Sequence, residues 1–162
     1  MAAEKSGGQI EKTIAYLDEQ GLDYEIFDHE VGFTAAEEAR AAGVDPQNAA
    51  KSVLVRDDAG YRLLVIQASD RLDLGKVRGL LGEGKELRFA TEEELGAEFP
   101  QFELGAIPPL GPMLPAPEII DPRVLDHERI LCNGGDHRHS VLIDPKELAR
   151  VTGAQVADVV EE

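Results

Sequence analysis

Lys51 is the residue in this chain whose surroundings most suggest chemistry. It opens the apolar run Lys51-Ser52-Val53-Leu54-Val55, in a sequence where 32 acidic residues stand against 16 basic ones. A single ammonium group at the mouth of a buried strand either reaches back to water or faces a polar cleft. In a cleft it could hold a phosphate or a developing oxyanion, or act as a base if its pKa is depressed. Position alone leaves both readings open.

A stiff loop over residues 105–117 is the second candidate. Its sequence is Gly-Ala-Ile-Pro-Pro-Leu-Gly-Pro-Met-Leu-Pro-Ala-Pro, and its five prolines exclude an interior strand or helix because they remove backbone donors and fix φ. Gly105 and Gly111 would let a ligand's ribose or backbone approach closely. A structural connection is the alternative, since the loop lacks the strand-to-helix setting of a phosphate-binding motif.

The third and fourth candidates lie near the end of the chain. Asn133-Gly134-Gly135-Asp136 predicts a turn whose amide groups could bind an oxyanion, with a plain hairpin turn as the alternative. A His-x-His pair follows and could supply two zinc ligands, but no third ligand stands at a motif spacing. We therefore expect no metal and no cofactor. The residues weighed for zinc are His29, His127, Cys132, His137 and His139.

Hydrophobic spacing predicts the elements that position these groups. Ile10, Ile14 and Leu17 recur at helical spacing before Gly21, which predicts a helix over about residues 8–20. Residues 24–27 predict a short strand. Thr34-Ala35-Ala36-Glu37 predicts a capping box that begins an Ala-rich helix ending at Gly43.

The middle of the chain predicts a hairpin followed by helices. Residues 51–56 and 61–67 are β-rich and flank a turn, so Lys51 should lie at the end opposite that turn. Asp73 and Thr91 can each cap a helix. Strands are expected at about 118–120, 129–133 and 139–143, with a last helix from Asp144-Pro145 to about residue 151. The pattern predicts an α+β fold, a mixed, barrel-like sheet surrounded by helices.

Length and composition predict a single domain. The 162 residues can bury most of their apolar surface, and one cysteine excludes an internal disulfide. No apolar run approaches membrane-spanning length and no charged-then-apolar leader opens the chain, so a cytoplasmic protein is expected.

The net charge of −16 argues against extensive nucleic-acid binding. Residues 1–50 hold three bases and eleven acids, residues 51–90 eight and six, and residues 91–162 five and fifteen, which gives −8, +2 and −10. Only the middle segment could accept a phosphate backbone. With six lysines against ten arginines, the surface could be adapted to high salt or be that of an ordinary acidic protein.

In combination these features resemble the YbaK/ProX family of aminoacyl-tRNA deacylases, which is related to the editing insertion domain of bacterial prolyl-tRNA synthetases. The likeness runs from about Tyr24 to Val159, and its fragments are specific in their order and spacing. The fragments are Phe33-Thr34, Ala50 to Val55, Arg71 to Val77, Gly105 to Gly111, Ile119-Ile120-Asp121, Asn133-Gly134-Gly135 and Asp144 to Leu148.

The resemblance implies a pocket on which Lys51, the Gly105–Gly111 loop and the Gly134–Gly135 turn converge. It implies hydrolysis of the ester of a mischarged tRNA, with Lys51 as the essential catalytic residue. The residues that it implies bind the substrate are Phe33, Thr34, Gly105, Ile107, Pro109, Gly111, Gly134, Gly135 and His137.

The implied chemistry suits a chain without a serine or cysteine nucleophile motif. An aminoacyl ester is already activated, so a site needs only to place water or the adenosine hydroxyl and to stabilise the oxyanion. The lining suggested by Ala106, Ile107 and Pro108 suits a small amino acid. The expected partner is the acceptor end of a mischarged tRNA, acted on in trans. Because the acidic surface is poorly suited to hold a whole tRNA, either the specificity is weak or a synthetase or an elongation factor supplies part of the affinity. DNA and membranes are not expected partners.

Two rival functions remain at this stage. One is a non-catalytic module of the same fold that binds a nucleotide or a partner protein. The other is a zinc-dependent hydrolase, which elemental analysis would separate. Retention of Lys51 with both loop glycines favours the deacylase.

Overall fold

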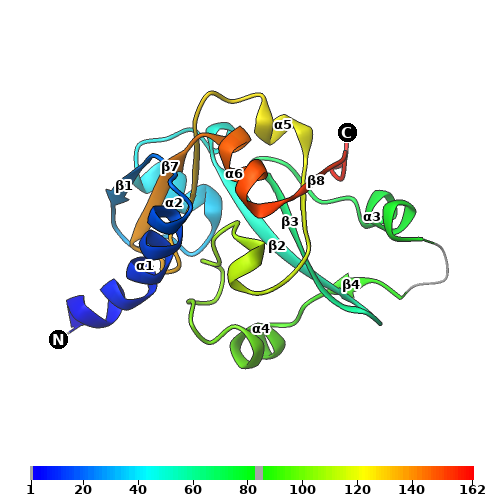
Figure 1. Cartoon of the computed structure of the whole chain (residues 1–162), viewed down its shortest axis with the longest axis horizontal. Coiled ribbons are helices and arrows are strands. Elements are labelled where there is room, and N and C mark those ends of the chain that lie inside the picture. Colours follow the sequence, from blue (N-terminus) through cyan, green and yellow to red (C-terminus); the bar gives the residue numbers. More distant parts are fainter. Residues whose placement is uncertain (1, 83–85) are drawn as a thin grey trace.

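Two β-sheets and six α-helices make up an α+β fold within residues 2–82 and 86–162, the part that the computed structural model describes, with side chains from Gln9 onward (Figure 1). The smaller sheet has the order β1-β7-β6, formed by Tyr24–Asp28, His139–Ile143 and Ile130–Asn133, all antiparallel. The predicted α+β class is therefore confirmed.

The larger sheet has the order β4-β2-β3-β5-β8 and is mixed. Its strands are Arg88–Phe89, Ala50–Asp57, Gly60–Gln67, Glu118–Ile120 and Gln155–Val156. β2 pairs antiparallel with both β3 and β4, whereas β3-β5 and β5-β8 are parallel. The strands described form two separate sheets, so the barrel-like closure expected from the sequence is not seen.

The β2–β3 hairpin is the centre of the fold, because both of its faces are buried. Leu63 and Val65 pack into a large core with α1 and the 105–117 loop, while Leu64 and Ile66 pack into a second core with α3 and the C-terminal segment. Adjacent residues of a strand point to opposite faces, so one strand serves both cores. In Figure 1, β1, β7 and α2 lie at one end of this hairpin, and β4 and α3 lie at the other.

Among the described residues, one bridge joins the two sheets near Lys51. Ala49 pairs with Leu131 in the parallel sense, just before β2 and within β6. Lys51 and Asn133 each lie two residues beyond this bridge, in the same strand direction. Residues i and i+2 of a strand have side chains on the same side. The side chains of Lys51 and Asn133 are therefore on the same side of the junction as those of Ala49 and Leu131.

Helices cover these sheets, and several begin at the capping residues that the sequence predicts. They are α1 (Ala2–Glu19), α2 (Ala35–Ala41), α3 (Leu74–Leu81), α4 (Glu92–Glu98), α5 (Pro122–Leu125) and α6 (Pro145–Thr152). Asp73 accepts from Gly75 N and Lys76 N, and Thr91 with Glu94 forms a reciprocal capping box, as predicted.

The structure departs from the sequence predictions at several places. α1 begins at Ala2 rather than near residue 8. Thr34 caps α2 as expected, but the Glu37 carboxylate accepts from Phe33 N rather than from Thr34 N, so the box is not reciprocal. One 3₁₀ turn, Gly111–Met113, interrupts the loop in which we expected no helix, with Pro112 in its first turn, where the missing N–H is not needed.

Candidate functional site

Lys51 lies half-buried in a surface hollow of about 320 Å³, which we call the Lys51 hollow. The residues that line it are Lys51, Val53, Arg71, Leu72, Phe89 and Glu161. Burial lowers the pKa of Lys51, the charge of Asp70 works against this, and the positive charge of Arg71 adds to it. Two cations around one hollow, one of them partly desolvated, are suited to hold an anion such as a phosphate.

A second group of residues lies behind the 105–117 loop and forms what we call the imidazole cluster. Its members are Phe33, Glu38, Gly105, Asn133 and His137. Asn133 Nδ2 at the end of β6 donates to Glu38 Oε2 at 2.9 Å and to the Gly105 carbonyl oxygen at 3.0 Å. A single amide group therefore ties α2 to the glycine loop.

His137 is held from two sides in this cluster. Its Nε2 is hydrogen-bonded to the carbonyl oxygen of Leu104, and its Nδ1 lies 3.6 Å from Glu38 Oε1. The ring of Phe33 is tilted against the imidazole at a centroid distance of 5.8 Å. The imidazole is thus fixed between the loop and α2.

Glu38 is the member with the most perturbed acidity. The side chain is buried, and this burial, with the charges of Asp136, Glu103 and Glu37, raises the pKa of Glu38 to about 8, against a smaller opposing effect of the Asn133 hydrogen bond. A carboxyl group that stays protonated near neutrality can donate a hydrogen bond.

Phe33 and Gly105 form the exposed surface of the cluster, which we call the Phe33–Gly105 wall. Phe33 is 72% exposed, and Gly105 is exposed with φ of +80°. A Cβ at Gly105 would lie 3.4 Å from His137 Cε1 and 3.5 Å from the Phe33 carbonyl oxygen. The missing side chain of Gly105 thus leaves room for about one carbon atom over the imidazole, and we call this space the recess.

Lys51 and the imidazole cluster belong to the same sheet junction. Within the described residues no hydrogen bond or ion pair joins them. They are connected through the Ala49–Leu131 bridge, and Lys51 and Asn133 each come two residues after it. The structure thus brings Phe33, Gly105 and His137 into direct contact and places Lys51 on the neighbouring strand.

Other predicted residues are packed into the interior. Ile107 belongs to the large core, and Pro109 lines an internal space with Leu110 and Cys132. Ala106 and Pro108 are buried as well, so the small-residue lining expected of these loop residues faces the core rather than an open pocket. Thr34 is exposed, and its hydroxyl caps α2.

The remaining predicted glycines serve close packing. Gly111 donates to Glu118 Oε1 at 2.6 Å, and a Cβ there would meet the Ala116 carbonyl oxygen at 2.5 Å. Gly134 N donates to the His139 carbonyl oxygen, so that amide is not free for an oxyanion. Added Cβ atoms at Gly134 and Gly135 would meet Ile10 Cδ1 at 2.8 Å and Phe102 Cδ1 at 3.0 Å. The Gly-Gly turn thus packs tightly against α1 and Phe102.

Glu38 and Arg71 were not predicted from the sequence as members of these sites, and Asn133 was considered only as part of the turn at residues 133–136. Glu38 had a detectable signal, because Ala35, Ala39 and Ala42 form the apolar side of α2 and Glu38 lies three residues after the first of them. An acid within an apolar stripe is a candidate for a buried, partnered carboxyl group.

The histidines considered for zinc bind protein groups instead. His29 Nε2 is 2.8 Å from Ser140 Oγ, His127 Nε2 is bonded to Gln67 Oε1, and His139 lies between Asp136 and Asp28 at 2.8 and 2.9 Å. Among the described residues no three histidine, cysteine or acidic side chains are grouped as a metal would require.

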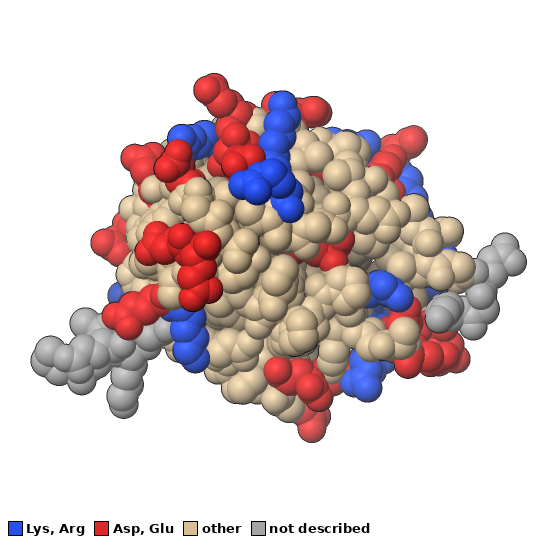
Figure 2. Space-filling view, viewed as in Figure 1, with Lys and Arg blue, Asp and Glu red and all other residues tan. Residues whose placement is uncertain are grey.

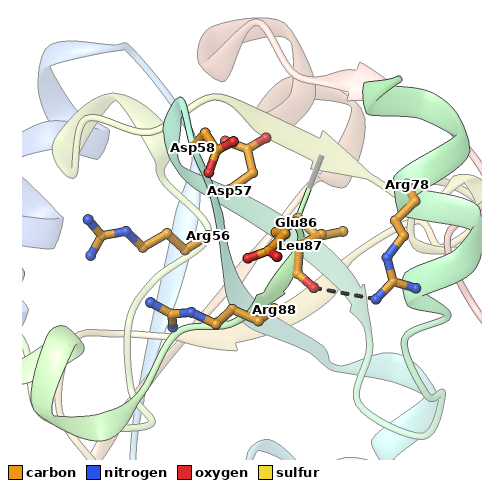
Figure 3. Close-up of a pocket in the computed structure, with 7 residues that line it drawn as sticks. All are labelled: Arg56, Asp57, Asp58, Arg78, Glu86, Leu87 and Arg88. Carbon is orange, nitrogen blue, oxygen red and sulfur yellow. Dashed lines mark hydrogen bonds between the residues drawn. The ribbon is translucent and has the colours of Figure 1, made fainter. Parts of the chain in front are cut away.

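A larger hollow of about 560 Å³ lies at the turn end of the hairpin (Figure 3), and we call it the hairpin hollow. The residues that line it are Arg56, Asp57, Asp58, Arg78, Glu86, Leu87 and Arg88. Arg56 and Arg88 lie side by side in Figure 3, and both pair with Glu94 at 2.6 Å. Three arginines against three acids leave this hollow without excess positive charge.

Among the charged side chains on the visible surface, acidic ones are more frequent than basic ones (Figure 2). Figure 2 shows them around much of the outline, with fewer basic side chains and an uncharged centre. No helix in the described part of the chain is long and apolar enough to cross a membrane.

Comparisons with known proteins find relatives of this chain both in sequence and in structure. Residues 29–151 match the family model of the aminoacyl-tRNA editing domain. The proline–tRNA ligase of Shouchella clausii (strain KSM-K16) is 32% identical over 130 residues, which is 80% of this chain and 22% of the ligase. The chain thus spans about a fifth of that relative's length.

Solved structures share the fold over nearly the whole chain. A candidate trans-editing enzyme for prolyl-tRNA synthetase superposes with a TM-score of 0.81 and 32% identity, over 95% of this chain and 98% of that one. The hypothetical protein APE2540 superposes with a TM-score of 0.83 and 28% identity, over 93% and 99%.

Proposed function

Because this chain belongs to the aminoacyl-tRNA editing domain family, in its YbaK/ProX-like branch, we propose that it hydrolyses the ester of a mischarged tRNA that carries a small amino acid, acting in trans. The observation that carries the proposal is the Lys51 hollow, which two cations line close to the Ala49–Leu131 bridge, in a chain of net charge −16. Where acids prevail, a desolvated lysine next to an arginine is suited to bind an anion.

Lys51 and Arg71 hold the terminal phosphate or ribose of the tRNA in this proposal. Desolvation strengthens the attraction between an ammonium group and a phosphate, and Arg71, whose side chain is 86% exposed, adds a second donor. The ester then lies along the junction toward Asn133, with the aminoacyl group against Phe33, Thr34 and Gly105.

Hydrolysis needs no protein nucleophile. Water adds to the ester carbonyl, the bond between the carbonyl carbon and the ribose oxygen breaks, and the products are the free amino acid and the tRNA hydroxyl. The protein supplies orientation and stabilises the charge that develops on the carbonyl oxygen.

A small amino acid fits the recess over the imidazole. Gly105 leaves about one side-chain carbon of space between Phe33 and His137, as the contacts of an added Cβ indicate. Each methylene that does not fit weakens binding of the transition state by roughly 1–3 kcal/mol, so the recess favours short side chains. The candidate trans-editing enzyme for prolyl-tRNA synthetase also supports action on free tRNA.

The test is single-turnover hydrolysis of tRNAs charged with alanine, serine, threonine, cysteine or proline. We expect measurable deacylation of at least one small amino acid above the uncatalysed rate. No deacylation of any of them would favour the binding module, and stoichiometric zinc needed for activity would favour a metal-dependent hydrolase.

A further inference from the structure

Glu38 has no role in the hydrolysis just described, yet with its neighbour His137 it forms a buried pair directly behind the Phe33–Gly105 wall. Glu38 is 2% exposed and His137 is 8% exposed. Glu38 Oε1 and His137 Nδ1 lie 3.6 Å apart, and both are buried atoms without a hydrogen-bond partner. Since an unpaired buried polar atom is costly, two that face each other indicate a proton between them.

The surrounding bonds determine which atom carries that proton. His137 Nε2 is bonded to the Leu104 carbonyl oxygen, which can only accept, so Nε2 carries a hydrogen. Nδ1 of the neutral ring is then an acceptor. Glu38 Oε2 already accepts from Asn133, which leaves Oε1 to donate toward Nδ1.

The charges around Glu38 favour its neutral form. The acidic groups that face it are Glu37 on its own helix, Glu103 from the loop after α4 and Asp136 from the β6–β7 turn, and the base that faces it is His137. Burial and these acids act in the same direction, which agrees with the pKa of about 8 for Glu38.

We propose that Glu38 is a positioning residue of the site, whose neutral carboxyl group donates to His137 Nδ1 and holds the imidazole against the Gly105 loop. The catalytic consequence rests on the proposed function, whereas the hydrogen bond does not. When Glu38 loses its proton, Oε1 and Nδ1 become two facing lone pairs that repel each other. The Asn133–Gly105 bond belongs to the same network, so the wall loosens as pH rises.

The hydrogen bond is tested in the free protein by nitrogen-15 NMR of the His137 ring. We expect the Nε2–H tautomer at pH 7 and a shift of the Nδ1 signal between about pH 7 and 9 as Glu38 ionises. Glu38→Gln should keep the tautomer and abolish the shift, because its amide donates to Nδ1 while its oxygen accepts from Asn133. Glu118→Gln, at another buried glutamate with a pKa raised to about 8, should leave the titration unchanged. A doubly protonated ring at pH 7, or a titration that survives Glu38→Gln, would overturn the proposal.

The positioning role is tested by single-turnover deacylation between pH 6 and 9, with the uncatalysed rate subtracted. The deacylation rate of the wild type should decline above about pH 8, as Glu38 ionises. Glu38→Gln should have a rate within about twofold of the wild type at pH 7 and should not show this decline. Glu38→Ala should be slower on the order of tenfold, the effect of one buried hydrogen bond. A glutamine variant as slow as the alanine variant would refute the role. If no tRNA is deacylated at all, the proposed function fails while the NMR titration still decides on the hydrogen bond.

Discussion

The Lys51 hollow and the hairpin hollow lie at opposite ends of β2 and both contain basic side chains, yet they differ in how those charges are used. Arg56 and Arg88 share Glu94, and Arg78 donates to the Leu87 carbonyl oxygen. Around the Lys51 hollow, by contrast, the described residues place no ion-pair partner on Lys51, and Arg71 has only a 4.0 Å contact with Glu161. The number of cations in a hollow thus says little about anion binding, and what matters is whether they are already paired.

The surroundings of the two hollows sharpen this difference. The hairpin hollow is larger, about 560 against 320 Å³. The Lys51 hollow, however, adjoins the sheet junction that carries the imidazole cluster. A partly desolvated ammonium group attracts an anion more strongly than exposed arginines that are already paired with acids.

Lys51→Ala should have the largest effect, lowering single-turnover deacylation on the order of a hundredfold or more with the fold intact, because it removes an electrostatic contact at the reaction centre. Lys51→Arg should not restore the rate, since a planar guanidinium cannot occupy the space of a compact ammonium. Lys146→Ala, which removes an exposed charge from α6, is the matched control and should be nearly silent. Full activity of Lys51→Ala, with an unchanged circular dichroism spectrum, would show that the Lys51 hollow is no more important for deacylation than the hairpin hollow.

Gly105→Val should be comparably damaging, because its side chain would fill the recess against His137 and Phe33. Gly43→Val is the matched control, with φ of +78° against +80° at Gly105 and no atom within 4 Å of an added Cβ. Both variants carry the same backbone strain, so both should melt at lower temperature. Only Gly105→Val should lose deacylation at a temperature where both are folded, and equal losses would mean that the recess has no special role.

Much of this fold could be predicted from its sequence because its signals are local. The hairpin turn at Asp57-Asp58-Ala59-Gly60, the caps at Asp73 and Thr91 and the strand near residue 118 all depend on neighbouring residues. β4 and β8 could not be predicted, since two-residue strands exist only through the partners that they find in the folded chain.

In the candidate site, too, residues with a local sequence signal could be predicted, and those that depend on tertiary contacts could not. Lys51, Gly105 and His137 stood out by residue type and motif, and a Cβ added at Gly105 would lie 3.4 Å from His137 Cε1. Gly111 and the Gly134–Gly135 turn looked equivalent in sequence but pack against Glu118 and α1. The sequence offers no spacing that separates a glycine facing a ligand from one that lets another segment of the same chain approach.

The free energy of unfolding should depend on pH through two buried carboxyl groups, because a buried carboxylate without a cationic partner is costly. The pKa of Glu38 and of Glu118 is raised from 4.5 to about 8, so the folded state holds protons that the unfolded chain releases above about pH 4.5. Their contribution to the free energy of unfolding is complete below that pH and is lost as pH rises toward about 8, with a slope of up to about 1.4 kcal/mol per pH unit for each group.

Chemical denaturation between pH 5 and 9 measures this contribution. The double variant Glu38→Gln and Glu118→Gln should lose less stability than the wild type across that range, because neither amide ionises. Parallel curves for the two proteins would show that these carboxyl groups do not hold their protons in the folded state.

Substitutions in the hairpin hollow should have the smallest effect. Arg78→Ala and Arg88→Ala should each change the dissociation constant for a tRNA acceptor stem by less than about twofold, because these guanidinium groups already bind Leu87 and Glu94 and the hollow has no net positive charge.

The logarithm of the affinity should fall with the logarithm of the salt concentration, with a slope that corresponds to only about one to three phosphate contacts. Arg71→Ala should reduce that slope by about one. Fluorescence anisotropy from 50 to 400 mM potassium chloride measures both quantities. A steep slope that Arg88→Ala lowers and Arg71→Ala does not would reverse the roles of the two hollows, since it would make the larger one the tRNA contact.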